Sequence, residues 1–249
     1  MKQEGTIGLL KKREMAGKYT YIPEIPEVFR CRVPLPGTLQ AFVMNGMLRE
    51  ELNLSSGLSL AGGEGSGFNL TIEKEAKVIE NIQIIGVRDT TSPDNQTFNS
   101  KIVYGENSFS NLLICTHTMS LEEFNTEEII DVEVKEGAKA NIVVMQNENN
   151  GSSHKTNFNL NLAKDSELKI STVTLHGAKI TNVVSANLNG TNANCQLNGI
   201  CLADGNQEMS TTIEMNHHIS NCRSSQLFKG ILDNNSRSVF NGKIIVDRD

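Results

Sequence analysis

The sequence of 249 residues contains no tryptophan, no Cys-x-x-Cys pair and no apolar run of the roughly 20 residues that a membrane-spanning helix needs. Its five cysteines are Cys31, Cys115, Cys195, Cys201 and Cys222. Because this set is odd and sparse, it argues against a disulfide framework and a zinc ribbon, and we interpret the cysteines as reduced thiols. The N-terminus lacks the apolar segment of a secretory signal. We therefore expect a cytoplasmic protein without a membrane segment.

Basic clusters and catalytic motifs are also scarce. The net charge is -6, and no Lys/Arg cluster is larger than "KKR", so proteins are expected as partners rather than nucleic acid. The glycine-rich "AGGEGSGF" lacks the Gly-Lys-Ser/Thr ending of a phosphate loop. A Walker motif, a Gly-x-Ser-x-Gly elbow and a Ser-His-Asp order are missing as well. The sequence thus predicts a protein that is not an enzyme.

Proline is confined to the first part of the chain. The five prolines are Pro23, Pro26, Pro34, Pro36 and Pro93. We predict a leading segment, residues 1–69, that is punctuated by proline and glycine and contains an Asn-Gly turn in "QAFVMNGMLREEL". Residues 70–249 are predicted to form a scaffold core of regular β-structure.

Apolar and polar residues alternate with a period of two through this core. In "TNFNLNLA", Phe158, Leu160 and Leu162 share one face, and asparagines occupy the other. This alternation is typical of a half-buried strand, and we expect the three apolar side chains to face inward. Leu168 and Ile170 are expected inward by the same rule.

A change of phase follows Ile170. Val173 and Leu175 have the opposite parity from Leu168 and Ile170, so the sequence predicts a corner near residues 171 and 172, which are serine and threonine. Short polar turns begin at Glu136, Lys164, Asn189, Asp204 and Asp233, which are 28, 25, 15 and 29 positions apart. Short strands, corners and a period in the twenties favour a parallel β-helix. The 28 asparagines suit its turns, and a β-sandwich is the alternative.

The stretch "EMNHHISNC" contains a candidate metal site, formed by His217, His218 and Cys222. On a strand, His217 would face inward with Met209 and Met215, whereas His218 would face the other side. Two adjacent histidines on a strand are poorly placed to bind one ion, and a stable zinc centre usually takes four ligands. We therefore predict that no metal is bound here.

The residues that follow are more informative. The His-His pair, the run from Ser224 to Asp233 ("SSQLFKGILD") and the run from Val239 to Ile244 ("VFNGKI") resemble the SufD branch of the SufB/SufD family, which provides scaffolds for iron–sulfur cluster assembly. The resemblance covers about residues 70 to 249 and is sharpest from about residue 210. It implies an all-β core folded as a right-handed parallel β-helix.

The resemblance also implies a function. A SufD-like chain is expected to be a non-catalytic subunit that pairs with SufB and with the SufC ATPase, while the iron–sulfur cluster is assembled in the complex. No cofactor is expected on this chain alone. Family members continue into strands with a Cys-x-His element and into C-terminal helices that bind SufC. Neither feature occurs in this sequence, so we expect a scaffold core or fragment.

Two other classes of function remain open. The first is a carbohydrate-processing β-helix enzyme, which would use surface carboxylates as acid and base. The absence of tryptophan for sugar stacking and of clustered acidic residues on one strand face argues against this class. The second is a structural adhesin or coat repeat, which would be exported.

A partner interface is predicted at the C-terminal end. The apolar strand "KIIV" precedes the charges of "DRD", so a strand edge here would attract another strand. In SufD relatives the late strands contact SufB, and without SufB two copies are expected to form a homodimer. The predicted interface residues are Val239, Phe240, Lys243, Ile244, Ile245 and Val246.

Overall fold

A computed structural model describes residues 35, 37–49, 53–54, 57–89, 95–118 and 122–248. All regular elements within these residues are β-strands, so the all-β prediction is confirmed. None of the described residues forms a helix with the length and apolarity that crossing a membrane requires.

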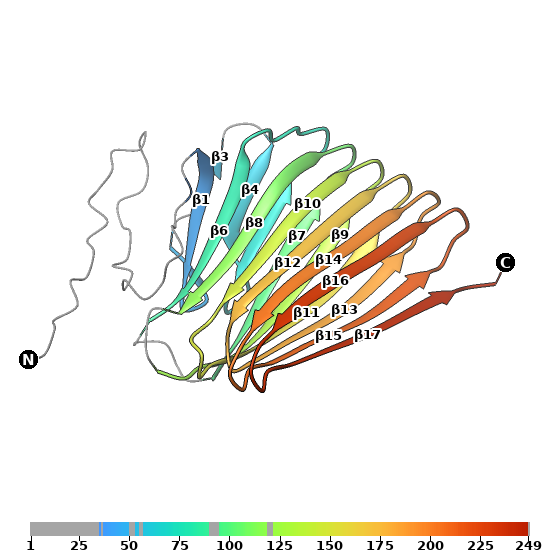
Figure 1. Ribbon diagram of the computed structural model, residues 1–249. Coiled ribbons are helices and arrows are strands. Elements are labelled where there is room, and N and C mark those ends of the chain that lie inside the picture. Colours follow the sequence, from blue (N-terminus) through green and yellow to red (C-terminus); the bar gives the residue numbers. More distant parts are fainter. Residues whose placement is uncertain are drawn as a thin grey trace, which may run out of the picture.

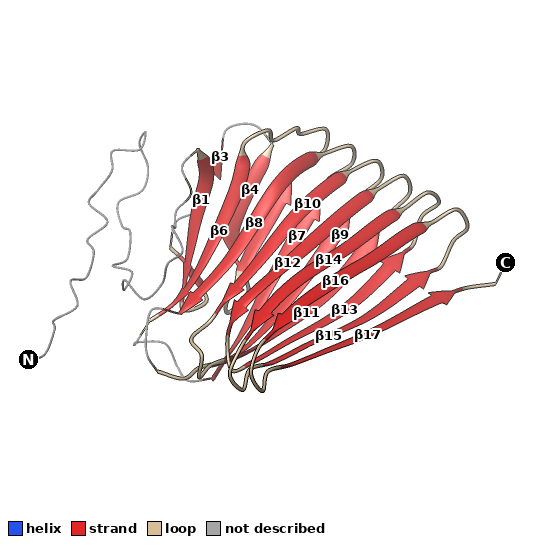
Figure 2. Cartoon of the chain, in the orientation of Figure 1, coloured by secondary structure: helices blue, strands red, loops and turns tan. Residues whose placement is uncertain are grey.

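The strands form two sheets that face each other (Figures 1 and 2). One sheet has the order β16-β14-β12-β10-β8-β6-β1-β2, and the other has the order β17-β15-β13-β11-β9-β7-β5-β4-β3. The strands are β1 (Thr38–Met44), β2 (Met47–Leu48), β3 (Asn53–Leu54), β4 (Leu58–Gly62), β5 (Phe68–Ile72), β6 (Asn81–Arg88), β7 (Asn95–Tyr104), β8 (Phe109–Thr118), β9 (Asn125–Val134), β10 (Lys139–Asn147), β11 (Ser153–Leu162), β12 (Glu167–His176), β13 (Lys179–Leu188), β14 (Asn194–Ala203), β15 (Glu208–His217), β16 (Arg223–Leu232) and β17 (Arg237–Val246).

Successive strands from β5 onward alternate between the two sheets, and from β6 onward each pairs in parallel with the strand one coil before it. For example, β11 pairs with β9 on one side and with β13 on the other. This connectivity is that of a parallel β-helix, and its crossovers have the right hand that parallel strands favour. The predicted fold is therefore confirmed, and the β-sandwich alternative is excluded.

Tight turns at one edge of the helix stack on one another. Each places one residue in the left-handed backbone region, which asparagine, aspartate and glycine tolerate best. These residues are Asn107, Gly137, Asp165, Asn192 and Asn221. The amide of Asp165 donates to the carbonyl of Thr191 in the next coil, at 2.9 Å. Asparagine therefore occupies three of these five turn positions.

The irregular step in the predicted turn spacing also has a structural cause. The turns at Glu136, Lys164 and Asn189 follow β9, β11 and β13 at one edge of the helix, whereas those at Asp204 and Asp233 follow β14 and β16 at the opposite edge. The short step of 15 residues passes from one edge to the other. Within each edge the spacing stays in the twenties.

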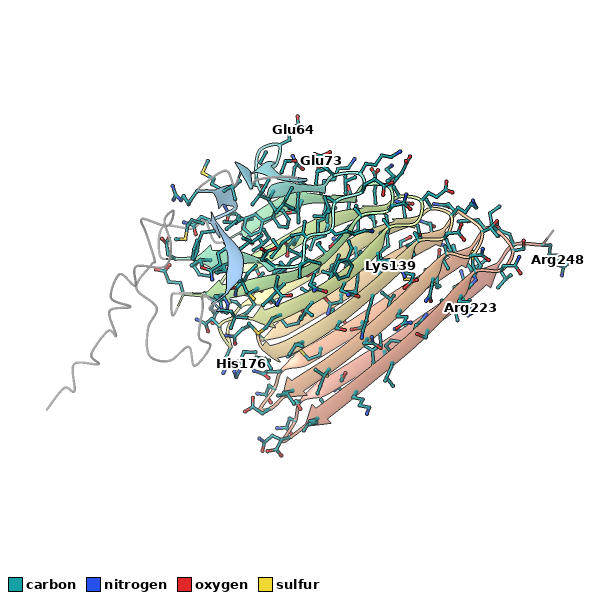
Figure 3. The ribbon with its side chains drawn as sticks, turned by 90° about the horizontal axis from the view of Figure 1, so that it is seen from above. Glu64, Glu73, Lys139, His176, Arg223 and Arg248 are labelled. Carbon is teal, nitrogen blue, oxygen red and sulfur yellow. The ribbon has the colours of Figure 1, made fainter. Side chains whose placement is uncertain are left out.

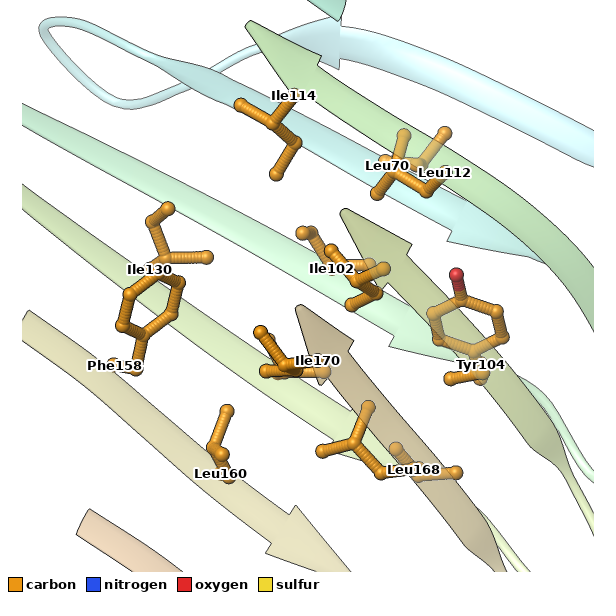
Figure 4. Close-up of a cluster of buried hydrophobic side chains, with 14 of the residues drawn as sticks. Leu70, Ile102, Tyr104, Leu112, Ile114, Ile130, Phe158, Leu160, Leu168 and Ile170 are labelled. Carbon is orange, nitrogen blue, oxygen red and sulfur yellow. The ribbon is translucent and has the colours of Figure 1, made fainter. Parts of the chain in front are cut away.

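The five side chains predicted to face inward lie in the hydrophobic core between the sheets. Figure 4 labels four of them, Phe158, Leu160, Leu168 and Ile170. Leu160 and Leu162 are fully buried, and Phe158, Leu168 and Ile170 are no more than 4% exposed. They pack with the apolar side chains of neighbouring coils, among them Ile102, Ile130 and Leu112. The alternation in the sequence therefore identified the core correctly.

The corner predicted near residues 171 and 172 is wrong. Strand β12 runs without a break from Glu167 to His176. Thr172 and Thr174 continue the buried row of Leu168 and Ile170. Ser171, Val173 and Leu175 are half-buried on the outer face. The inward face changes from apolar to polar residues, and this change mimicked a shift of phase.

Hydrogen bonds make this polar interior stable. Thr174 donates to Oε1 of Gln146 at 2.7 Å, and Nε2 of Gln146 donates to Oδ1 of Asn182 at 2.8 Å. The same nitrogen lies 3.1 Å from Oγ1 of Thr156. Because buried polar groups are tolerated when they are paired, one end of each strand can be polar inside the helix.

The predicted leading segment, residues 1–69, is partly built into the β-helix. Strand β1 pairs in parallel with β6, and the predicted Asn-Gly turn joins β1 to β2 in a hairpin. Asn45 and Gly46 both have positive φ, as the tight hairpin turn requires. Residues 1–34 lie outside the described residues.

The buried core supports a first prediction. Replacing Leu160, which is fully buried, with alanine should lower the free energy of unfolding by about 2 to 5 kcal/mol, through lost burial and the cavity left behind. Urea denaturation measures this loss. Asn159→Ala, one residue earlier and exposed, is the matched control and should change stability much less. Equal losses in both variants would contradict the assignment of faces.

Candidate functional site: the uncapped end of the β-helix

Strands β16 and β17 form the outer edges of the two sheets at the C-terminal end (Figure 1). β16 pairs with β14, and β17 pairs with β15. No strand among the described residues pairs with their other edges. An edge of this kind presents backbone N–H and C=O groups that can bind a further strand.

The six predicted interface residues lie on β17, at this edge. Val239, Phe240, Ile244 and Val246 are between 46% and 68% exposed, which is high for apolar side chains. Ile245 is half-buried. The sixth, Lys243, lies 3.2 Å from a carboxylate oxygen of Glu214 on β15. The interface itself stays a prediction.

Several of these apolar side chains belong to core rows. Ile244 pairs with Met215, which pairs with Ala186, which pairs with Leu160. The three earlier members are fully buried, whereas Ile244 is 57% exposed. Its exposure follows from its place in the outermost coil of the described chain. Within the described residues, the last coil therefore exposes apolar core surface, which we call the uncapped end: β16 and β17.

An aromatic pair lies across the uncapped end. The ring centroids of Phe228 on β16 and Phe240 on β17 are 4.9 Å apart. A Cβ on Gly199 would lie 2.3 Å from the Phe228 ring, so only glycine leaves room for this ring. Beside the pair is a cavity of about 270 Å³ between the sheets. Cys201 lines it, with its Sγ 3.6 Å from Oγ of Ser238.

Charged side chains border the uncapped end. Figure 3 shows Arg223, at the start of β16, and Arg248, which follows β17, toward this end of the ribbon. Lys229 faces outward on β16, and Lys243 does so on β17. An apolar centre with a charged border is the arrangement that protein–protein contacts commonly have.

The candidate metal residues have separate partners. Nε2 of His217 lies 2.8 Å from Oγ of Ser224, whereas Nδ1 of His218 lies 2.8 Å from a carboxylate oxygen of Asp247. His217 is half-buried and His218 is exposed. Cys222 donates from Sγ to the carbonyl of Gly190 at 3.3 Å, and burial raises the pKa of its thiol. Within the described residues, no three His, Cys, Asp or Glu side chains are grouped to hold a metal ion.

A buried charged cluster, which the sequence reasoning missed, lies inside the β-helix. We call Glu128, Glu148 and His154 the charged cluster. Nδ1 of His154 lies 2.7 Å from Oε1 of Glu148, and its Nε2 lies 3.4 Å from Oε2 of Glu128. All three residues are at most 6% exposed. Thr118 donates to the other oxygen of Glu148 at 2.5 Å.

The cluster keeps its charges despite burial. Burial alone would lower the pKa of His154, but the two carboxylates outweigh this effect and raise the pKa to about 9. Burial alone would raise the pKa of Glu148, but the hydrogen bond and charge of His154 lower it to about 2. The imidazolium and the Glu148 carboxylate therefore stabilise each other inside the core.

Strand parity contained the signal for this cluster. His154 has the parity of Phe158 and Leu160 on β11, and Glu128 has the parity of Ile130 on β9. The rule that identified the core thus also directs these two side chains inward. Glu148 follows the end of β10, where strand alternation gives no guidance.

The separate partners of His217, His218 and Cys222 lead to a prediction about metal binding. The isolated chain should bind neither zinc nor iron stoichiometrically through His217, His218 and Cys222, because each side chain has its own partner. Elemental analysis of protein purified without chelators tests this. One tightly held equivalent that Cys222→Ala removes, and that the control Cys201→Ala keeps, would contradict it.

The charged cluster predicts a pH-dependent stability. Because the pKa of His154 is raised from 6.5 to about 9, the folded protein binds more protons than the unfolded chain in this window, and stability should fall as pH rises through it. His154→Gln should cost about 3 to 5 kcal/mol and remove this fall. Urea denaturation across the window measures both effects. The exposed His176→Gln is the control, and an unchanged pH profile in His154→Gln would refute the assignment.

Comparison with known proteins identifies the family. The family model described as SUF system FeS cluster assembly, SufBD core domain, matches residues 88–249, which is more than half of the chain. The iron-sulfur cluster assembly protein SufD of Escherichia coli (strain K12) is 33% identical over 99 residues, which are 40% of this chain and 23% of that protein. The chain thus matches less than a quarter of this relative's length. The resemblance to SufD is confirmed, and the chain belongs to the SufBD core family of the SUF iron–sulfur cluster assembly system.

Proposed function

We propose that the chain is a non-catalytic scaffold subunit of the Suf iron–sulfur cluster assembly complex, where it pairs with homologues of SufB and of the SufC ATPase. Its membership of the SufBD core family supports a role in cluster assembly. The similarity to a SufD protein supports the SufD-like position in such a complex. The proposal places the chain in the cytoplasm.

The uncapped end carries the proposal. Ile244 and Val246 expose apolar surface in rows that earlier coils bury, Phe240 on the same strand is also exposed, and β17 offers a strand edge. A partner that adds a strand to this edge and covers the apolar rows would gain backbone hydrogen bonds and apolar burial together. A SufB homologue is the proposed partner, and a second copy of this chain takes its place when SufB is absent.

Iron and sulfide are cargo in this proposal rather than resident cofactors. The cluster is assembled in the complex, and this chain alone binds no cofactor. The hydrogen bonds of His217, His218 and Cys222 support this division, because each side chain is directed to a different residue.

A carbohydrate-processing enzyme has less support. Such an enzyme needs two carboxylates that face a bound sugar. Glu128 and Glu148 are buried and share His154. The half-buried carboxylates of Glu127 and Glu133 pair with lysines of neighbouring coils. Acid–base catalysis therefore has no pair of free carboxylates in these places.

Association through the uncapped end is testable. The chain should co-purify with coexpressed SufB and SufC homologues, and alone it should form a homodimer. The double variant Phe240→Asp, Ile244→Asp should lose both associations, because it places charge in the apolar contact. Affinity pull-down measures the first, and light scattering over a concentration series measures the second.

The control for this experiment is Asn241→Asp, which adds charge at an exposed position between the two. It should associate as the parent does. A parent chain that is strictly monomeric would refute the homodimer. A double variant that still co-purifies with the SufB homologue would refute the proposed interface.

A further inference from the structure

The charged cluster borders a small cavity near the N-terminal end of the β-helix. The cavity measures about 30 Å³, which is room for about two water molecules. Its polar lining consists of Arg88, His117, Thr116, Thr126, Ser100 and the charged cluster. The rest of the lining is mainly apolar and includes Phe68 and Ile114.

His117 is the unusual member of this lining. It is 3% exposed, and neither ring nitrogen has a hydrogen-bond partner among the described protein atoms. Burial lowers the pKa of His117 to about 4, although the charge of Glu148 opposes this, so the ring is neutral near pH 7. A neutral imidazole has one N–H donor and one acceptor nitrogen. A buried group of this kind is costly unless something pairs with it.

The charges around the cavity restrict what can pair with His117. Arg88 and His154 are positive, and Glu128 and Glu148 are negative, so the four buried groups balance. An added cation or anion would upset this balance in a medium where uncompensated charge is costly. The ligand must therefore be small, neutral and able both to donate and to accept.

We propose that the cavity is a structural hydration site, in which about two water molecules bind His117 and the polar groups of the charged cluster. Water meets each requirement, since it fits the volume, is neutral, and both donates and accepts. The bound water completes the hydrogen bonding of His117 and connects it to Glu148. The charged cluster then extends through solvent atoms to β8, the strand that carries His117.

A crystal structure of the full chain tests this directly. It should show ordered solvent density at about 2.7 to 3.2 Å from a ring nitrogen of His117. In solution, a nuclear Overhauser effect should connect long-lived water to the backbone amides of Thr116 and Thr118. A dry cavity, or an imidazole turned onto a protein acceptor, would overturn the proposal.

A variant adds a thermodynamic test. His117→Leu removes the polar ring with a similar volume, so the bound water loses its partner. The equilibrium constant for unfolding should rise about tenfold. If the cavity is dry, leucine removes an unpaired polar group, and the equilibrium constant for unfolding should fall. Increased stability of His117→Leu would therefore contradict the hydration site. His176→Leu, at an exposed position, is the control. If His117→Leu does not fold, the crystal structure and the nuclear Overhauser measurement on the parent chain still test the proposal.

Discussion

The in-register stacking of successive coils is the constraint on which the rest of the structure depends. Each strand bonds to the strands one coil before and one coil after, so Leu160 has Val132 on one side and Ala186 on the other. A side chain must therefore suit the residues at the same position in both neighbouring coils. This requirement produces continuous rows, which are apolar at one end of the strands and polar at the other.

The same rows explain what the sequence could predict. Alternation located Phe158 and Leu160 because an apolar row leaves a period of two in every strand. It failed at Thr172 because a buried polar row resembles an exposed one in the sequence, and only the partners in other strands distinguish them. His154 lay within reach of the parity rule, but its pairing with Glu148 depends on a loop and could not be predicted.

The interior and the uncapped end have different physical characters. Inside, His154 and Arg88 offset the charges of Glu128 and Glu148, which suits the proposed scaffold role. At the end, Ile244 is exposed although its row is a core row, and Phe240 on the same strand is exposed as well. The proposed scaffold role needs both properties, a rigid body and a surface that a partner can complete.

Hydrogen–deuterium exchange tests the central claim, that the uncapped end receives the partner, most directly. Exchange would be compared for the chain alone and in the presence of the SufB homologue. The account predicts that the partner slows exchange in β16 and β17, whose outer edges no described strand covers, and leaves β9 to β12 unchanged. Unchanged exchange in β16 and β17, with slowing at another face of the β-helix, would contradict it.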